Sequence, residues 1–153
     1  MKIYAPNTTE RVRYAMDLVL KQVCLFDYEY VSKEEIKTSD RIVNYSGEHI
    51  ESSFQVHPHG LLFENDIKKF DVTFEYGGKE KVKLFTTEFD DLGFDIFSAS
   101  FFLATRFEEY WRFESDHHDR YTSKSSLASK LGYLHLPLVN IWGEALKEKL
   151  KTY

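Results

Sequence analysis

The sequence has a single cysteine, no long apolar run and no excess of positive charge, and each absence excludes a class of protein. Because Cys24 has no second cysteine to pair with, neither an internal disulfide nor a thiolate metal cluster can form. No stretch of roughly 18 apolar residues predicts a membrane-spanning helix, and the N-terminus lacks the apolar core of a signal peptide. The net charge of −5 disfavours nucleic-acid binding. We therefore expect a cytoplasmic protein with no nucleic-acid partner and no membrane partner.

Motifs of well-known enzyme classes are also missing. There is no glycine-rich phosphate loop and no Gly-x-Ser-x-Gly nucleophile elbow. The stretch TTEFDD (86–91) is similar to the Thr-Phe-Asp-Asp stretch of polysaccharide deacetylases, whose acids serve as base and metal ligand. Glu88 interrupts this likeness, and no His-x-x-x-His pair follows. We interpret Asp90 and Asp91 as the polar entry to a helix, and we predict neither a metal nor a cofactor.

The residues that are present predict one α/β domain over 1–153. Hydrophobic residues make up 42% and aromatic residues 16% of the chain, which is enough for a core at this length. A helical apolar stripe lies between two segments of strand character, a spacing typical of a βαβ unit with parallel strands. The predicted strands are 2–5, 26–31, 41–46 and 52–64, and the first helix covers 8–24 with Asn7 or Thr8 as its N-cap. We expect a mixed sheet with helices on both faces.

A β-hairpin is predicted over 70–85, where two strand-like runs flank a pair of glycines. A two-residue turn would place apolar residues opposite lysines. A loop of odd length instead aligns apolar residues, for example Phe70 with Leu84 and Val72 with Val82. We therefore expect a bulged or three-residue turn with Gly78 at positive φ.

The strongest predicted helix covers 94–113, with Asp95 as its N-cap and a wide apolar face. We expect Phe97, Phe101, Leu103 and Phe107 to be almost fully buried. The polar segment 114–133 predicts a loop with a short helical turn. A C-terminal helix is expected from about residue 141.

The stretch RFEEYWRFESDHHDRY (106–121) combines charges of both signs with histidines and large aromatics. On a helix, Glu108 would pair with Arg112, and Arg106 with Glu109, which predicts ordinary ion pairs at a helix end. The functional alternative requires these residues to converge, so that arginines clamp an anion or a histidine and an acid move a proton. The candidate network or ligand site comprises Arg106, Glu108, Glu109, Asp116, His118, Arg120 and Tyr121.

Two weaker possibilities concern metal ligands. Glu109, Asp116 and His118 are suitable donors, but their spacing matches no established metal motif. His57 and His59 would face the same side of a strand and form a secondary candidate site. Because Pro58 lies between them, a bent strand end with satisfied histidines is the preferred interpretation.

The combination of HGLLFE (59–64), FDIFSASFFLATRFEEY (94–110), DHHDRY (116–121) and PLVNIW (137–142) resembles an uncharacterised domain. That domain stands at the N-terminus of bacterial polysaccharide deacetylase-like proteins, and the likeness covers nearly the whole chain. Where the family pattern has glycine before the arginine, this chain has Asp119. The resemblance implies that an enzyme domain would follow residue 153.

The sequence therefore favours a non-catalytic accessory domain of a polysaccharide deacetylase-like protein. Its expected roles are to position the downstream deacetylase domain or to recognise a glycan or another protein. The competing hypothesis is a small metal-assisted hydrolase that uses Glu109, Asp116, His118 and Arg120. Convergence of those four side chains in an open pocket would favour the hydrolase.

Overall fold

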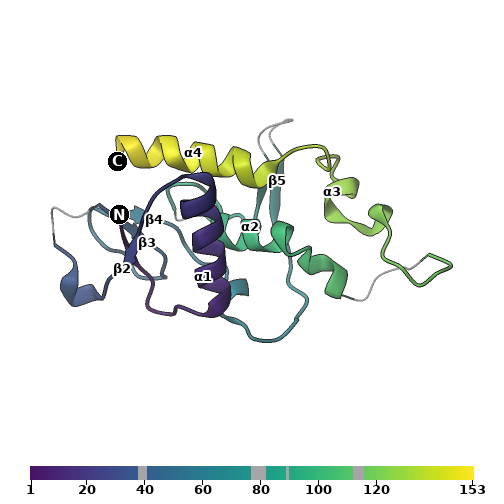
Figure 1. Ribbon diagram of the computed structural model, residues 1–153, viewed down its shortest axis with the longest axis horizontal. Helices are drawn as coiled ribbons and strands as arrows, with labels where there is room; N and C mark the ends of the chain where they lie inside the picture. The colour runs from purple at the N-terminus through teal and green to yellow at the C-terminus, as the bar shows by residue number, and fades with distance from the viewer. Residues whose placement is uncertain (38–40, 77–81, 89, 112–115) are drawn as a thin grey trace.

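The first half of the chain forms a small parallel sheet. We analysed a computed structural model, which describes residues 1–37, 41–76, 82–88, 90–111 and 116–153 (Figure 1). The four strands pair in the order β2-β1-β3-β4, and every pair is parallel. They are β1 (Lys2–Tyr4), β2 (Glu29–Tyr30), β3 (Ile42–Asn44) and β4 (Phe54–Gln55). The predicted βαβ opening and the α/β class are thereby confirmed.

The crossover between β1 and β2 is one continuous helical segment with two geometries. The helix α1 (Glu10–Met16) continues into π-helical turns over η1 (Asp17–Val23). The amide of Cys24 accordingly donates to the carbonyl of Val19, five residues earlier. The N-cap is Thr9, whose hydroxyl accepts from the amide of Val12, and not Asn7 or Thr8 as predicted.

The predicted hairpin is present, but its predicted register is wrong. The strands β5 (Phe74–Tyr76) and β6 (Val82–Leu84) form a separate antiparallel sheet in which Phe74 pairs with Leu84 and Tyr76 with Val82. The structure buries Val82 and Leu84 but leaves Phe74 49% exposed. The apolar pattern of β5 therefore did not constrain the register, because only β6 faces the core. Gly78 lies outside the described residues.

The helix predicted over 94–113 ends much earlier. The helix α2 (Ile96–Ala104) is followed by a 3-10 turn, η4 (Phe107–Tyr110), and Arg106 between them has a left-handed backbone with φ of 51°. This break turns the chain so that Phe107 is buried beside Phe101 and Phe102. Tertiary burial of an aromatic ring has here overridden helix propensity.

The remaining elements surround the far end of α2. Segment 116–133 contains η5 (Ser123–Ser125) and the short helix α3 (Leu127–Lys130), which confirms the predicted loop with a helical turn. The last helix, α4 (Leu138–Thr152), begins three residues before the predicted position. Figure 1 shows the parallel sheet at one end of the molecule and α3 at the other, with α2 between them. Two further 3-10 turns are η2 (Lys33–Glu35) and η3 (Leu61–Phe63).

Helix α2 contacts both α1 and α4, α4 also contacts η1, and the core lies between these helices and the parallel sheet. The helices leave no room for a side chain at Gly143 of α4, where an added Cβ would lie 2.3 Å from Cγ1 of Val23. Only glycine therefore fits at this crossing without a shift of its neighbour. None of the described helices is long and apolar enough to cross a membrane.

The N-cap of α2 is the centre of a buried polar cluster. Asp95 accepts hydrogen bonds from the amides of Phe97 and Ser98, which confirms it as the cap. It also accepts from the hydroxyls of Tyr45 and Ser98 and from the amide of His59. Burial raises the pKa of Asp95, while these hydrogen bonds act in the opposite direction. This Asp95 cluster connects the residue after β3, the segment before η3 and the start of α2.

Candidate functional site

The charged stretch 106–121 separates into two local ion pairs. Arg106 pairs with Glu109 across the helix break, and its side chain is 73% exposed. Arg120 pairs with Asp116 through Nε at 3.1 Å and a terminal nitrogen at 2.9 Å. Among the described residues, no interaction joins the two pairs. The single connected network stays a prediction, because residues 112–115 between the two pairs, including Arg112 as the expected partner of Glu108, lie outside the described residues.

Asp116 organises a local turn. Its carboxylate accepts from the amides of His118 and Arg120 as well as from the Arg120 side chain. These hydrogen bonds, the Arg120 amide first, lower the pKa of Asp116. Asp119 completes the turn with a left-handed backbone, at the position where the resembled family has glycine. Asp119 thus adopts the left-handed conformation that a glycine would favour at this position of the turn.

The candidate metal ligands do not converge. His118 is exposed, and its ring lies 3.8 Å from the ring of His117. Glu109 remains with Arg106, and Asp116 remains within its own turn. Over the described residues, no cluster of three or more histidine, cysteine, aspartate or glutamate side chains is suited to a metal ion.

The two histidines of HPHG follow the end of β4. The backbone amide of His57 donates to Asp90 at 3.3 Å, and that of His59 donates to Asp95 at 2.8 Å. The ring of His59 contacts Phe85, and burial lowers the pKa of the His59 imidazole. Two acids therefore accept hydrogen bonds from the backbone amides of this bend, whereas hydrogen bonding of the two imidazole rings stays a prediction. Both histidines border a shallow surface basin that also includes Glu75 and Lys83.

Asp90 and Asp91 hold the loop before α2. Asp90 accepts from the amides of Leu92 and Gly93, and Asp91 accepts from the amide of Gln55 at 2.7 Å. Burial raises the pKa of Asp90. These contacts support the interpretation of the acids as a polar entry to the helix.

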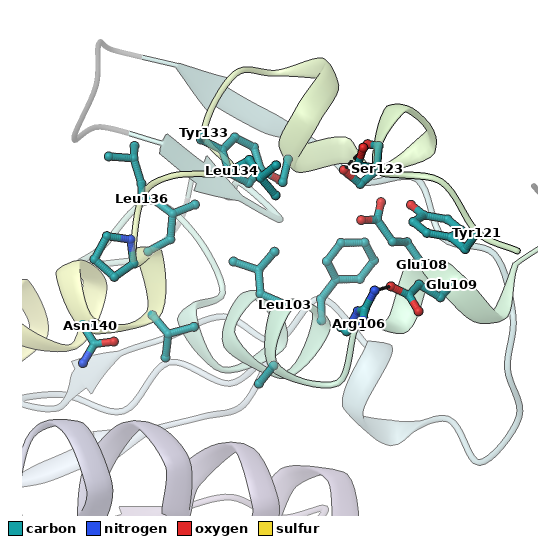
Figure 2. Close-up of a pocket in the computed structure, with 17 residues that line it drawn as sticks. Leu103, Arg106, Glu108, Glu109, Tyr121, Ser123, Tyr133, Leu134, Leu136 and Asn140 are labelled. Atoms are coloured by element: carbon teal, nitrogen blue, oxygen red, sulfur yellow. Dashed lines mark hydrogen bonds and ion pairs between the residues drawn. The ribbon is translucent and has the colours of Figure 1, made fainter.

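A different cavity is formed where α2 ends. It has a volume of 440 Å³, within the range of about 300–1,000 Å³ that small-molecule sites occupy. Figure 2 shows its lining, which comes from α2, η4, the segment around α3 and the start of α4. Its apolar walls include Phe102, Leu103, Leu134, Leu136 and Val139. Leu103 was predicted to be almost fully buried, but it is only partly buried because it faces this cavity.

Glu108 and Tyr121 form the polar end of the cavity. Figure 2 shows the Glu108 carboxylate beside the Tyr121 hydroxyl. The same carboxylate accepts from the amide of Leu127 at the start of α3, at 2.8 Å. Burial first, and Glu108 second, raise the pKa of Tyr121, so its hydroxyl keeps its proton at neutral pH. Two residues of the predicted site thus meet, and Arg106 and Glu109 lie on the same lining.

Tyr133 also lines the cavity, and sequence reasoning did not identify it. The residue is only 2% exposed, and its hydroxyl has no hydrogen-bond partner within the described part of the chain. Buried polar groups without a partner are rare in folded proteins. Burial, followed by the charge of Glu108, raises the pKa of Tyr133, so this hydroxyl is also protonated. The cavity wall therefore includes a residue whose protonated hydroxyl is covered from solvent and has no partner among the described residues.

No local signal in the sequence identifies Tyr133. It follows Gly132, whose φ of 74° ends the α3 segment, and this turn directs the next side chain inward. A glycine before a tyrosine is common, and the missing partner depends on residues distant in sequence. The Asp116–Arg120 motif, in contrast, was visible in the sequence but lies outside this cavity.

The sequence profile of one protein family matches residues 1–153. The chain belongs to a family of unknown function (DUF7033). Membership of this family confirms the expectation of an uncharacterised domain, and the family description names no activity, ligand or link to polysaccharide deacetylases. No curated protein and no solved structure matches the chain.

Proposed function

We propose that this domain of the DUF7033 family is a non-catalytic binding module that recognises a glycan. The glycan would bind in the cavity at the end of α2 that Tyr133 lines, here named the Tyr133 cavity. The observation that carries the proposal is the buried Tyr133 hydroxyl, which has no partner among the described residues and borders a cavity of 440 Å³. A buried hydroxyl without a hydrogen-bond partner destabilises the folded protein when no ligand is bound. A ligand that accepts a hydrogen bond would remove that cost.

The proposal includes the context implied by the resemblance. The domain would be an accessory part of a cytoplasmic polysaccharide deacetylase-like protein, and an enzyme domain would follow residue 153. Binding of a glycan at the cavity would then hold the polymer near the enzyme domain. The resemblance supports this arrangement, and sequencing the gene past codon 153 tests it directly.

Nothing specific favours the metal-assisted hydrolase. That hypothesis requires Glu109, Asp116, His118 and Arg120 to share one site. Glu109 lines the Tyr133 cavity, whereas the other three lie in the separate Asp116 turn.

The experiment combines a binding assay with an activity assay on the purified chain. Soluble chitin and peptidoglycan oligomers are added to the ¹⁵N-labelled protein, and amide resonances are followed by NMR. We expect shifts at residues that line the cavity, such as Leu103, Tyr133 and Asn140, and no acetate release with or without zinc. Acetate release that disappears in Asp90→Ala would establish an enzyme instead, and no shift with any oligomer would reject the glycan-binding module.

A further inference from the structure

We infer that the Tyr133 cavity recognises the acylamino group of an N-acylated amino sugar. The inference rests on the proposed function and names the part of the glycan that enters the cavity. It is based on three properties of the lining: a buried donor, a carboxylate acceptor and an apolar wall.

The donor is the Tyr133 hydroxyl. Because it is protonated and has no partner among the described residues, a ligand carbonyl oxygen is a suitable acceptor for it. A ligand that offers only donors, such as an ammonium group, would leave the Tyr133 proton unused. An amide carbonyl is thus better matched than a free amine.

The acceptor is the Glu108 carboxylate. One of its oxygens accepts from the Leu127 amide at 2.8 Å, and a carboxylate has capacity for further hydrogen bonds. An amide N–H is a suitable donor to this group. An anionic ligand is disfavoured, because it would meet the carboxylate in a partly apolar cavity.

The apolar wall accounts for the acyl substituent. Leu103, Leu134 and Leu136 contribute aliphatic surface beside the polar end, and Leu134 is 64% exposed in the free protein. A methyl group placed against this wall removes apolar surface from water. A secondary amide with a methyl substituent supplies the donor, the acceptor and the apolar group together.

The polar rim favours a sugar as the carrier of the amide. Ser123, Asn140 and the Arg106–Glu109 pair line the cavity and can form hydrogen bonds with ring hydroxyls. These groups come from η5, α4 and the α2–η4 break, so they surround the apolar wall. A ring that bears several hydroxyls suits this distribution.

The test compares three sugars that differ only at one ring position. N-acetylglucosamine, glucosamine and glucose are titrated into the ¹⁵N-labelled chain, and dissociation constants are taken from the cavity resonances. We expect N-acetylglucosamine to bind about tenfold more tightly than the other two, the difference that one or two hydrogen bonds and a buried methyl group supply.

Two variants assign the effect to the cavity. Tyr133→Phe removes one oxygen and should weaken N-acetylglucosamine binding about tenfold without lowering the melting temperature. Leu136→Trp should obstruct the cavity and abolish binding while Tyr133 remains. Tyr110→Phe is the matched control, because Tyr110 is 64% exposed and lies outside the lining, and its affinity should equal that of the parent.

The contrary results separate the inference from the proposed function. Equal or tighter binding of glucosamine or glucose at the cavity would overturn the acylamino assignment and leave the glycan-binding module intact. Binding of N-acetylglycine N-methylamide at the cavity without any sugar would retain the amide and reject the sugar. If none of these compounds and no oligomer shifts the cavity resonances, both proposals are wrong.

Discussion

Two buried tyrosine hydroxyls, one at the start of α2 and one near its end, have different surroundings. Tyr45 is fully buried, and its hydroxyl donates to Asp95 at 2.9 Å. Tyr133 is 2% exposed, and within the described residues its hydroxyl has no partner. Burial raises the pKa of each above the ordinary tyrosine value, so both hydroxyls stay protonated. The two residues thus share chemistry and burial but differ in whether the fold uses the hydroxyl.

Under the proposed function, the difference separates a structural polar group from a binding group. At Asp95 every donor serves a contact within the fold, including the cap of α2 and the bend at His59. At Tyr133 the surrounding residues form a cavity instead of a partner. A buried polar group indicates a binding site only after the partners within the fold have been accounted for.

Replacement of Asp95, the centre of the Asp95 cluster, should lower the free energy of unfolding more than any other substitution considered. Asp95→Ala deletes the N-cap of α2 and leaves the buried Tyr45 hydroxyl without its acceptor. We expect the free energy of unfolding to fall by about 2–4 kcal/mol, the sum of a lost cap and an unsatisfied buried group. Urea denaturation followed by circular dichroism measures this value. A loss below that of an ordinary surface substitution would show that the cluster is not structural.

The comparison itself is tested by matched Tyr→Phe variants. Tyr45→Phe leaves Asp95 with one donor fewer in a buried site, so we expect a loss of about 1–3 kcal/mol. Tyr133→Phe removes a hydroxyl that has no partner in the described structure, so its stability should equal or exceed that of the parent. Both are read from urea midpoints under identical conditions. Equal destabilisation by the two substitutions would contradict the distinction between the two sites.

The pH dependence of stability should differ between the parent and Asp95→Asn. Because the pKa of Asp95 is raised in the folded state, the folded protein holds this proton more tightly than the unfolded chain does. The contribution of Asp95 is therefore most favourable below its ordinary value of 3.8 and decreases as the pH rises through the folded value. We expect the stability of the parent relative to Asp95→Asn to decrease over that interval. A constant difference across a pH series of urea titrations would exclude a raised pKa.

The smallest effect is expected at the Asp116 turn. The Arg120 side chain is 68% exposed, and solvent screens its pair with Asp116. Arg120→Ala should change the melting temperature much less than Tyr45→Phe does, and no more than the control Lys124→Ala. A loss comparable to that of Asp95→Ala would instead identify a network buried under native conditions.

Elements defined by local patterns were predicted well. The βαβ unit follows from alternation in the strands and the helical stripe between them, and the Asp95 cap follows from a single residue before an apolar run. The end of α2 was not predictable from the same pattern. The apolar positions continue through Phe107, but the chain breaks at Arg106 so that Phe107 reaches the aromatic cluster of Phe101 and Phe102.

The candidate site was only partly predictable for a similar reason. Charge density directed attention to 106–121, and Glu108 and Tyr121 do meet there. The cavity also needs Leu103 before the break and Tyr133 after α3, and their meeting depends on the left-handed turn at Arg106. The charged residues at 116–120 satisfy one another within a few positions, so their density reflects a local turn.

The crossing of α4 over η1 also limits how the sequence can diverge. Since a Cβ at Gly143 would lie 2.3 Å from Val23, the two positions share one small volume. A larger residue at 143 requires a smaller one at 23, and neither change is tolerated alone at full packing. The residues at positions 23 and 143 should therefore covary among family members. Their covariation would trace the α4–η1 contact in homologues whose overall sequences have become hard to align.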